Sequence, residues 1–433
     1  MPLPRPQKLL IYLDQNFISD IAKVERRRPE FDELYSLLHQ GFWEEKLVVL
    51  RSVFHEVETS MAGSLADPIR SGQSTIGHVR LLHPIDVKES QIVRALQLRL
   101  GNADVQDVIT FDDIFEENPD RRLHHIEIDV NCDWQHAGAR QDRQQLADQL
   151  DRVRKRIFDN SVSYKEQLLI EMREMRGQAL SSANARQYTA ASGATMAQLV
   201  EFVASPAFER IPIVRLEAGL LARLMTAYAN RPIRAGDATD VDAMAAYLPY
   251  CDMYAADGAM VAIARQEAVD SMFGCELFSS RGEVDQLIQR VRTRLENMAP
   301  VNVPALSVFV AATEDIKENA FNFFRVIGSQ AKSVENRLGK WVEVFGFDDG
   351  AMPQYGLAPF CGLQEVVIKS CNVTDSRDVL VDACRKSCRS RNFILVDRFE
   401  ALPNDFITRS LSAAEAGLPD ILGHKIYDIQ IQT

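Results

Sequence analysis

The chain has 433 residues, more than one ordinary hydrophobic core accommodates, so its length predicts two or three domains. Apolar residues make up 46% and charged residues 25%, a balance typical of folded rather than disordered protein. The formal net charge of −12 argues against a generally basic surface that coats nucleic acid, although it allows a local basic groove.

The N-terminal segment lacks the pattern of a targeting or membrane-spanning sequence. Its apolar run ends at Asp14 and is too short for a signal peptide or a membrane helix. The seven cysteines are an odd number without paired spacing, which favours reduced thiols. Cys384 and Cys388 lie four residues apart without a further Cys or His pair nearby, so we interpret them as buried side chains and not as a zinc site. We therefore expect a cytoplasmic protein that does not associate with membranes.

The first strands and helices indicate a parallel sheet. Residues 8–13 and 47–54 are short apolar runs rich in strand-forming residues, and a helical stretch separates them. This β-α-β order predicts two parallel neighbouring strands. From about 86 to 230 the pattern is helical, charged on one face and poor in strand signals, which predicts a long helical insertion.

The α/β pattern then resumes and later repeats in a second domain. A helix, a short strand at 251–256, a further helix and a strand at 275–280 complete a first domain over 1–298. Residues 299–304 contain two prolines and little periodicity, which marks a boundary. Beyond it, strands and helices alternate over 305–433, which predicts a second α/β domain. The expected strands of this domain are 305–312, 341–347, 365–371, 393–397 and 425–432, and the expected helices are 314–327 and 376–388.

Four acidic residues stand where predicted strands end or the following helices begin: Asp14, Glu56, Asp240 and Asp257. Each by itself could be a helix cap or a charge that complements a helix dipole. Together they fall at the carboxyl edge of one sheet, where open α/β sheets bind ligands. Clustered carboxylates repel one another unless a cation lies between them, and Mg²⁺ or Mn²⁺ suits such oxygen ligands. These ions activate water and neutralise a phosphodiester, which is nuclease chemistry.

Three segments carry a resemblance to PIN-domain nucleases. The segment IYLDQNFISDIA resembles their first motif, VLRSVFHEVETS their second, and GDATDVDAMAAYLPYCDMYAADGAM their last two acidic motifs. The likeness covers about 1–85 and 231–298. It implies a PIN-like α/β domain in which the four acids bind metal, with Asn16 and Ser19 in support. Asp237, Asp242 and Asp252 are nearby acids that could replace or supplement Asp240, which we rank first for its spacing to Asp257; Asp237 is a candidate fifth member of the site.

Other patterns are weaker. The run HEVET lacks the second histidine of a zinc protease helix, and Gly339-Lys340 is not followed by the residues of a P-loop. The pair His124-His125 lies among charges in the insertion and indicates a surface role. Basic clusters occur at 26–28, at 152–156 and at 385–391, and the first two are the better placed to steer a phosphate backbone.

The sequence thus predicts a divalent-metal-dependent endonuclease with a nucleic acid substrate, RNA being favoured over DNA by the resemblance. A toxin or phage-defence effector is an attractive context by analogy. The alternative is a non-catalytic PIN-fold scaffold whose C-terminal domain binds a partner or a nucleotide signal. A regulatory protein or a second copy of the chain is a further expected partner.

Overall fold

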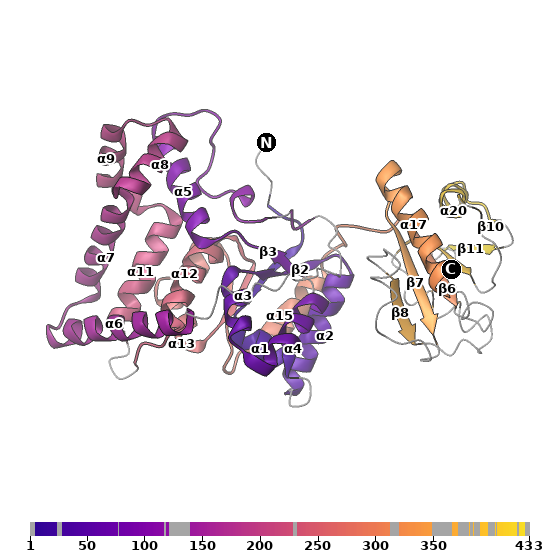
Figure 1. The fold of residues 1–433 in the computed structure, drawn as a ribbon, viewed down its shortest axis with the longest axis horizontal. Helices are drawn as coiled ribbons and strands as arrows, with labels where there is room; N and C mark the ends of the chain where they lie inside the picture. The colour runs from indigo at the N-terminus through magenta and orange to yellow at the C-terminus, as the bar shows by residue number, and fades with distance from the viewer. Residues whose placement is uncertain are drawn as a thin grey trace. The chain divides into compact units, whose positions relative to one another are not determined.

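Two compact α/β units make up the protein, and the chain passes from one to the other between Ala299 and Pro300 (Figure 1). This division falls inside the segment expected to be the boundary. The computed structural model describes residues 5–23, 28–76, 78–116, 118–120, 139–227, 232–311, 320–348, 366–370, 381, 384, 390–396, 403, 405–421 and 424–428.

A parallel sheet of five strands forms the centre of the first unit, in the order β3-β2-β1-β4-β5. Because both faces of such a sheet are covered, its strands read as continuous apolar runs, and every residue of β1 and β2 is buried. The strands are β1 (Leu9–Leu13), β2 (Leu47–Arg51), β3 (His78–Arg80), β4 (Met253–Ala256) and β5 (Glu276–Ser279).

The strand order places a topological switch point between β1 and β4. From β1 the chain builds the sheet outward through β2 and β3, and it then returns to the other side of β1 with β4. Connections leave β1 and β4 in opposite directions there, which opens a crevice at their carboxyl ends. The backbone N–H of Asp14 donates to the carbonyl of Ala255 at 2.8 Å and joins the two strand ends.

Helices α1, α2, α4 and α15 lie at one end of the first unit (Figure 1). At Gly41 in α2 an added Cβ would come within 2.5 Å of Leu47 and 2.9 Å of Leu295, so this glycine allows α2 to pack closely on β2 and α15. The bounds are α1 (Gln15–Ala22), α2 (Pro29–Trp43), α3 (Val53–Ser60), α4 (Ala66–Ile76) and α15 (Val284–Glu296).

Most of the described part of the predicted insertion is helical, and its first helix begins at Pro84 (Figure 1); the described residues between Arg99 and Ala139 contain only a short 3-10 helix, Phe111–Asp113. Prolines at the first positions of α5 and α11, and capping boxes at Ser163 and Thr195, start its helices. The helices are α5 (Pro84–Arg99), α6 (Ala139–Asp159), α7 (Tyr164–Ala179), α8 (Ser182–Ser192), α9 (Met196–Ala204), α10 (Pro206–Glu209) and α11 (Pro212–Thr226). Within the described ranges no helix combines the length and the apolar character that crossing a bilayer requires.

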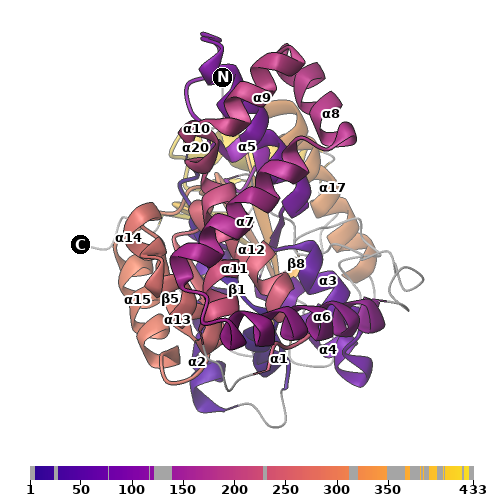
Figure 2. The same cartoon turned by 90° about the vertical axis from the view of Figure 1, so that its left-hand side faces the viewer.

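Helix α6 differs from its neighbours in direction. Figure 2 shows it crossing the view in front of α1, α3 and α4, whereas α7 and α11 run at a steep angle to it. An ion pair between Arg143 of α6 and Glu58 of α3 fixes this placement, with 2.9 Å between Nη1 and Oε1. The insertion therefore reaches the sheet at the carboxyl edge.

The second unit contains a mixed sheet in the order β10-β11-β9-β6-β7-β8. Strands β9, β6, β7 and β8 are parallel, and β11 and β10 extend the sheet antiparallel. The five predicted strands correspond to β6 (Leu306–Ala311), β7 (Val342–Asp348), β8 (Val366–Ser370), β9 (Asn392–Val396) and β11 (His424–Asp428), while β10 (Asp420–Ile421) was not predicted.

The helices of the second unit agree less well with the prediction. The helix expected at 314–327 appears as α17 (Ala320–Leu338), and the structure adds α20 (Phe406–Glu415). Of the helix expected at 376–388, only residues 381 and 384 are described, so the remainder lies outside the described residues. Cys384 is buried and Cys388 is not among the described residues.

Candidate active site

Asp14 lies at the switch point, between the last residue of β1 and the first of α1. Its Oδ1 accepts the backbone N–H of Gln15 at 2.7 Å, which makes it the N-cap of α1. Its Oδ2 accepts the side-chain amide of Asn16 at 2.9 Å. Asn16 therefore holds the orientation of the Asp14 carboxylate. Ser19 is partly buried on the same helix, and within the described residues its hydroxyl makes no bond to Asp14.

A buried histidine attaches α3 to the end of β1. His55 accepts the backbone N–H of Ser52 at Nδ1, 3.0 Å away, and its Nε2 donates to the carbonyl of Leu13 at 2.7 Å. These two bonds require the neutral ring with its proton on Nε2. Because Leu13 precedes Asp14, the histidine holds one face of α3 against the acidic edge. The HEVET run thus has a structural histidine where a zinc protease would have a ligand.

Glu58, and not Glu56, is the acid that α3 contributes to the site. Phe54, His55 and Glu58 line one pocket with Asp14 and Asp240. Glu56 instead approaches the Nε atoms of Arg51 at 3.8 Å and Arg80 at 3.9 Å.

The helical period explains this difference from the expectation. Residues two apart on an α-helix point about 200° apart, so Glu56 and Glu58 cannot face the same pocket. The burial of His55 and Thr59 shows which face is turned inward. In the sequence Glu58 follows His55 by three residues and so shares its face, but only the tertiary structure shows that this face is turned inward.

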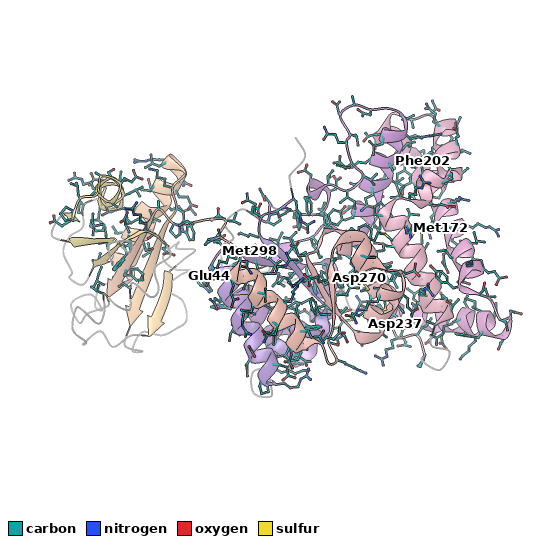
Figure 3. All side chains as sticks on the ribbon, turned by 180° about the vertical axis from the view of Figure 1, so that it is seen from behind. Glu44, Met172, Phe202, Asp237, Asp270 and Met298 are labelled. Atoms are coloured by element: carbon teal, nitrogen blue, oxygen red, sulfur yellow. The ribbon has the colours of Figure 1, made fainter. Side chains whose placement is uncertain are left out.

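Two further helices begin at the same edge. Helix α12 (Asp237–Tyr247) carries Asp237 in its first position and Asp240 one turn later, and Figure 3 labels Asp237 at this helix start. Helix α13 (Gly258–Gln266) has Asp257 as its N-cap, with Oδ1 accepting the N–H of Ala259 at 2.8 Å. The N-termini of α1, α12 and α13 thus all meet the acidic edge, and their dipoles favour negative charge there.

Arg234 lies just before α12 and connects these acids. Its backbone N–H donates to Asp237 Oδ2 at 2.8 Å, and its guanidinium is 4.0 Å from Asp257 Oδ2. The Arg234 side chain is 58% exposed, whereas Asp237 is 2% exposed. Asp237 therefore holds the loop that leads into α12 in place. Arg234, which it bonds, puts a positive charge beside Asp257 on the exposed side of the acidic cluster.

The carboxylates of this cluster are close enough to change one another's ionisation. Burial raises the pKa of Asp14 to about 6, and the charges of Glu58 and Asp257 add to that rise while the bonds from Asn16 and Gln15 oppose it. Burial also raises the pKa of Asp240 well above its usual range, and Asp14 and Glu58 contribute next. Buried carboxyl groups whose pKa values are raised by burial and by one another's charges are typical of a functional site.

Glu58 has a counter-ion of its own. Burial raises the pKa of the Glu58 carboxyl, and the charge and hydrogen bond of Arg143 work against that rise.

The two other acids considered for the site lie elsewhere. Asp242 is on the opposite face of α12. Burial and the nearby charge of Glu217 raise the pKa of its carboxyl to about 7, although the charge of Lys88 opposes that rise.

Asp252 precedes β4 and so lies at the amino edge of the sheet, where its carboxylate bonds Arg5 at 2.6 Å and the N–H of Leu10 at 2.8 Å. Neither can supplement Asp240.

The pocket that Asp14, Glu58 and Asp240 line, with Asp257 outside its lining, is small and has an aromatic floor. About 10 Å³ is open to the centre of a water molecule, roughly the space that one ordered water needs. Tyr12 stacks on Tyr254 with ring centroids 4.5 Å apart, and its hydroxyl lies 3.1 Å from Ser52 Oγ. The lining residues are Tyr12, Asp14, Phe54, His55, Glu58, Thr239, Asp240, Ala243, Met244, Tyr254 and Ala256.

The carboxylate oxygens of the cluster are chemically suited to a hard divalent cation, but their present spacing is not that of ligands to one ion. Asp14, Glu58, Asp240 and Asp257 offer the carboxylate oxygens that Mg²⁺ or Mn²⁺ prefers. Among the described residues, no three His, Cys, Asp or Glu side chains are arranged as ligands of one ion. Binding of an ion would therefore require these side chains to close around it.

The basic clusters are described only in part. Arg28 pairs with Glu30 at 3.2 Å and lies over the ring of Phe31, while residues 26 and 27 lie outside the described residues. Within 152–156, Arg154 is buried beside Asp151, and Arg152, Lys155 and Arg156 are exposed. His124, His125 and the basic residues at 385, 386 and 389 also lie outside the described residues.

Comparisons with models of protein families, with curated proteins and with solved structures find no match for this chain. Its chemistry is therefore inferred from the site itself.

Proposed function

We propose that the first unit is a PIN-like, divalent-metal-dependent endonuclease that hydrolyses phosphodiester bonds of nucleic acid, with RNA the favoured substrate. The observation that carries this proposal is the convergence of Asp14, Glu58, Asp240 and Asp257 at a topological switch point, where burial and mutual repulsion raise the pKa values of Asp14 and Asp240. If these carboxylates served only as helix caps, they would not need to lie close to one another.

The roles of the residues follow from their positions. Asp14, Glu58, Asp240 and Asp257 would hold the ion, and Asn16 fixes the orientation of Asp14. A Mg²⁺ or Mn²⁺ ion in such a site lowers the pKa of bound water and neutralises charge on a phosphodiester. The aromatic floor of Tyr12 and Tyr254 excludes water from beneath the acids, which strengthens their attraction for a cation.

The test is cleavage of labelled single-stranded and structured RNA and DNA with Mn²⁺, with Mg²⁺ or with chelator. Wild type should cut in the presence of metal, and Asp14→Asn and Asp257→Asn should each abolish cutting. Asp252→Asn is the matched control, because it removes the same charge from the other end of β4 and should keep the metal-dependent activity. Cutting that persists in chelator, or that survives both site substitutions, contradicts the proposal.

A non-catalytic scaffold is the second candidate. The Arg143–Glu58 ion pair and the spacing of the carboxylates favour it, since a guanidinium already neutralises one acid of the cluster. In that case metal should change neither stability nor function, and Asp14→Asn should leave both unaltered. A role as a toxin or phage-defence effector stays a prediction that rests on the two-unit layout alone.

A further inference from the structure

Arg143 lies on the face of α6 that is turned toward the rest of the first unit. Ala147, Arg154 and Ile157 follow it at helical spacing and are buried. The Arg143 side chain is 16% exposed and its Nη1 is 2.9 Å from Glu58 Oε1. The insertion thus delivers a cation into the acidic cluster, and this bond uses one of the five N–H donors of the guanidinium.

A second tie joins α6 to the other side of the cluster. Asp151 Oδ1 accepts Arg154 Nη2 at 2.9 Å and the backbone N–H of Ile233 at 3.3 Å. Ile233 precedes Arg234, whose guanidinium is 4.0 Å from Asp257. Arg143 and Arg234 therefore approach the carboxylates from segments that are bonded to each other.

The Arg143–Glu58 bond conflicts with a metal at the same carboxylate. A divalent ion that binds Glu58 competes with the guanidinium for its oxygens, and repulsion between the two cations disfavours both remaining there. The pocket as it stands has room for about one water molecule and none for a phosphate group, so a phosphate would have to bind at its rim, on the side from which Arg143 reaches Glu58. A guanidinium released from Glu58 would lie beside the ion, where a phosphate arrives, and it forms bidentate bonds with phosphate.

We propose that Arg143 is a substrate-binding residue supplied by the helical insertion: it pairs with Glu58 in the metal-free protein and with a phosphate oxygen of the nucleic acid once Glu58 turns to the metal. This inference rests on the proposed function. It also gives the insertion a role, because the residues outside it would then bind metal and the insertion would bind the substrate's backbone.

The test measures two affinities in the full-length protein, neither of which requires turnover. The first is the affinity for Mn²⁺ by calorimetry. The second is the affinity for a fluorescein-labelled, phosphorothioate single-stranded RNA in the presence of Mn²⁺. The variants are Arg143→Gln, the conservative Arg143→Lys, and Arg173→Gln as a control that removes the same charge from an exposed position of helix α7, outside the basic clusters.

Arg143→Gln should bind Mn²⁺ more tightly, by about threefold to tenfold, because Glu58 loses its competing cation. It should bind the RNA about tenfold more weakly, and the slope of log affinity against log salt should become less negative by about 0.7, as expected for one lost phosphate contact on a single strand. Arg143→Lys should recover part of the RNA affinity, and Arg173→Gln should leave both the Mn²⁺ affinity and the RNA affinity unchanged. A purely structural role for Arg143 would weaken both affinities together.

The inference is overturned if Arg143→Gln leaves Mn²⁺ affinity unchanged or lowers it, or if its RNA affinity and salt slope equal those of wild type. Glu58→Gln separates this failure from that of the proposed function. If Glu58→Gln weakens Mn²⁺ binding while Arg143→Gln behaves as wild type, only the role of Arg143 is wrong. If wild type binds no Mn²⁺, the metal site and this inference fail together.

Discussion

The two edges of the five-stranded sheet treat their carboxylates in opposite ways. At the amino edge, Asp252 pairs with Arg5 at 2.6 Å and Glu45 with Lys8 at 2.6 Å, the second pair almost wholly buried. At the carboxyl edge, Asp14 and Asp240 face other acids, and burial together with those neighbours raises their pKa values. The acids of the amino edge thus have their own counter-ions, whereas Asp14 and Asp240 at the carboxyl edge lie among acids that repel them in the absence of a ligand.

Glu58 and Glu56 give the sharpest form of this comparison. Glu58→Gln should lower metal-dependent cleavage by at least about 100-fold, equivalent to about 2.7 kcal/mol of transition-state stabilisation. Glu56→Gln should keep activity within about threefold, because its side chain lies beside Arg51 and Arg80 outside the cluster. The measurement is kcat/KM on the best substrate of the panel. Equal losses in both variants would show that the pocket is not the site.

Metal should stabilise the carboxyl edge and leave the amino edge indifferent. Mn²⁺ at about 100 times its Kd should stabilise the first unit by about 2.7 kcal/mol. This corresponds to a rise of about 5–10 °C in the Tm of that unit, and the rise should vanish in Asp14→Asn but persist in Asp252→Asn. Thermal unfolding with and without chelator measures it. A rise of the same size in Asp14→Asn would place the ion elsewhere.

Without metal, neutral substitutions should have opposite signs at the two edges. Asp240→Asn removes a buried, mutually repelled charge and should raise the Tm of the first unit by about 2–4 °C in chelator at pH 7.5. Asp252→Asn removes a partner of Arg5 and of the Leu10 N–H and should lower it by a similar amount. Differential scanning calorimetry reports both. If both variants are destabilised alike, the carboxyl edge is not strained by its charges.

The smallest effect concerns Asp242, which lies on the far face of α12 near Lys88, Glu217 and Tyr247. Burial raises its pKa to about 7, well above the unfolded value, so its contribution to stability is present at low pH and is lost as pH rises through about 7. Asp242→Asn should therefore raise Tm by about 1–3 °C at pH 8.5 relative to wild type and have little effect at pH 5. A larger gain at pH 5 than at pH 8.5 would contradict this sign.

The sequence alone determined the α/β class, the two-unit division near residue 300 and the acids of β1 and β4. Strands buried on both faces are continuous apolar runs, and Asp14 and Asp257 directly follow two of them. Their location at the carboxyl edge of the sheet can therefore be predicted from their positions in the sequence. The helical character of the insertion was equally readable from its period. Strand β3 was missed because three residues are too few to form a pattern.

The tertiary structure decided which acids share the pocket and what reaches them. Glu56 and Glu58 are both acids of one short helix, and the choice between them depends on the rotation of α3, which the bond from His55 to the Leu13 carbonyl fixes across 42 residues. Asp252 and Asp257 differ only in the end of β4 on which they lie. The approach of Arg143 from α6 to Glu58 joins residues 85 positions apart, and local spacing carries no information about contacts over such separations.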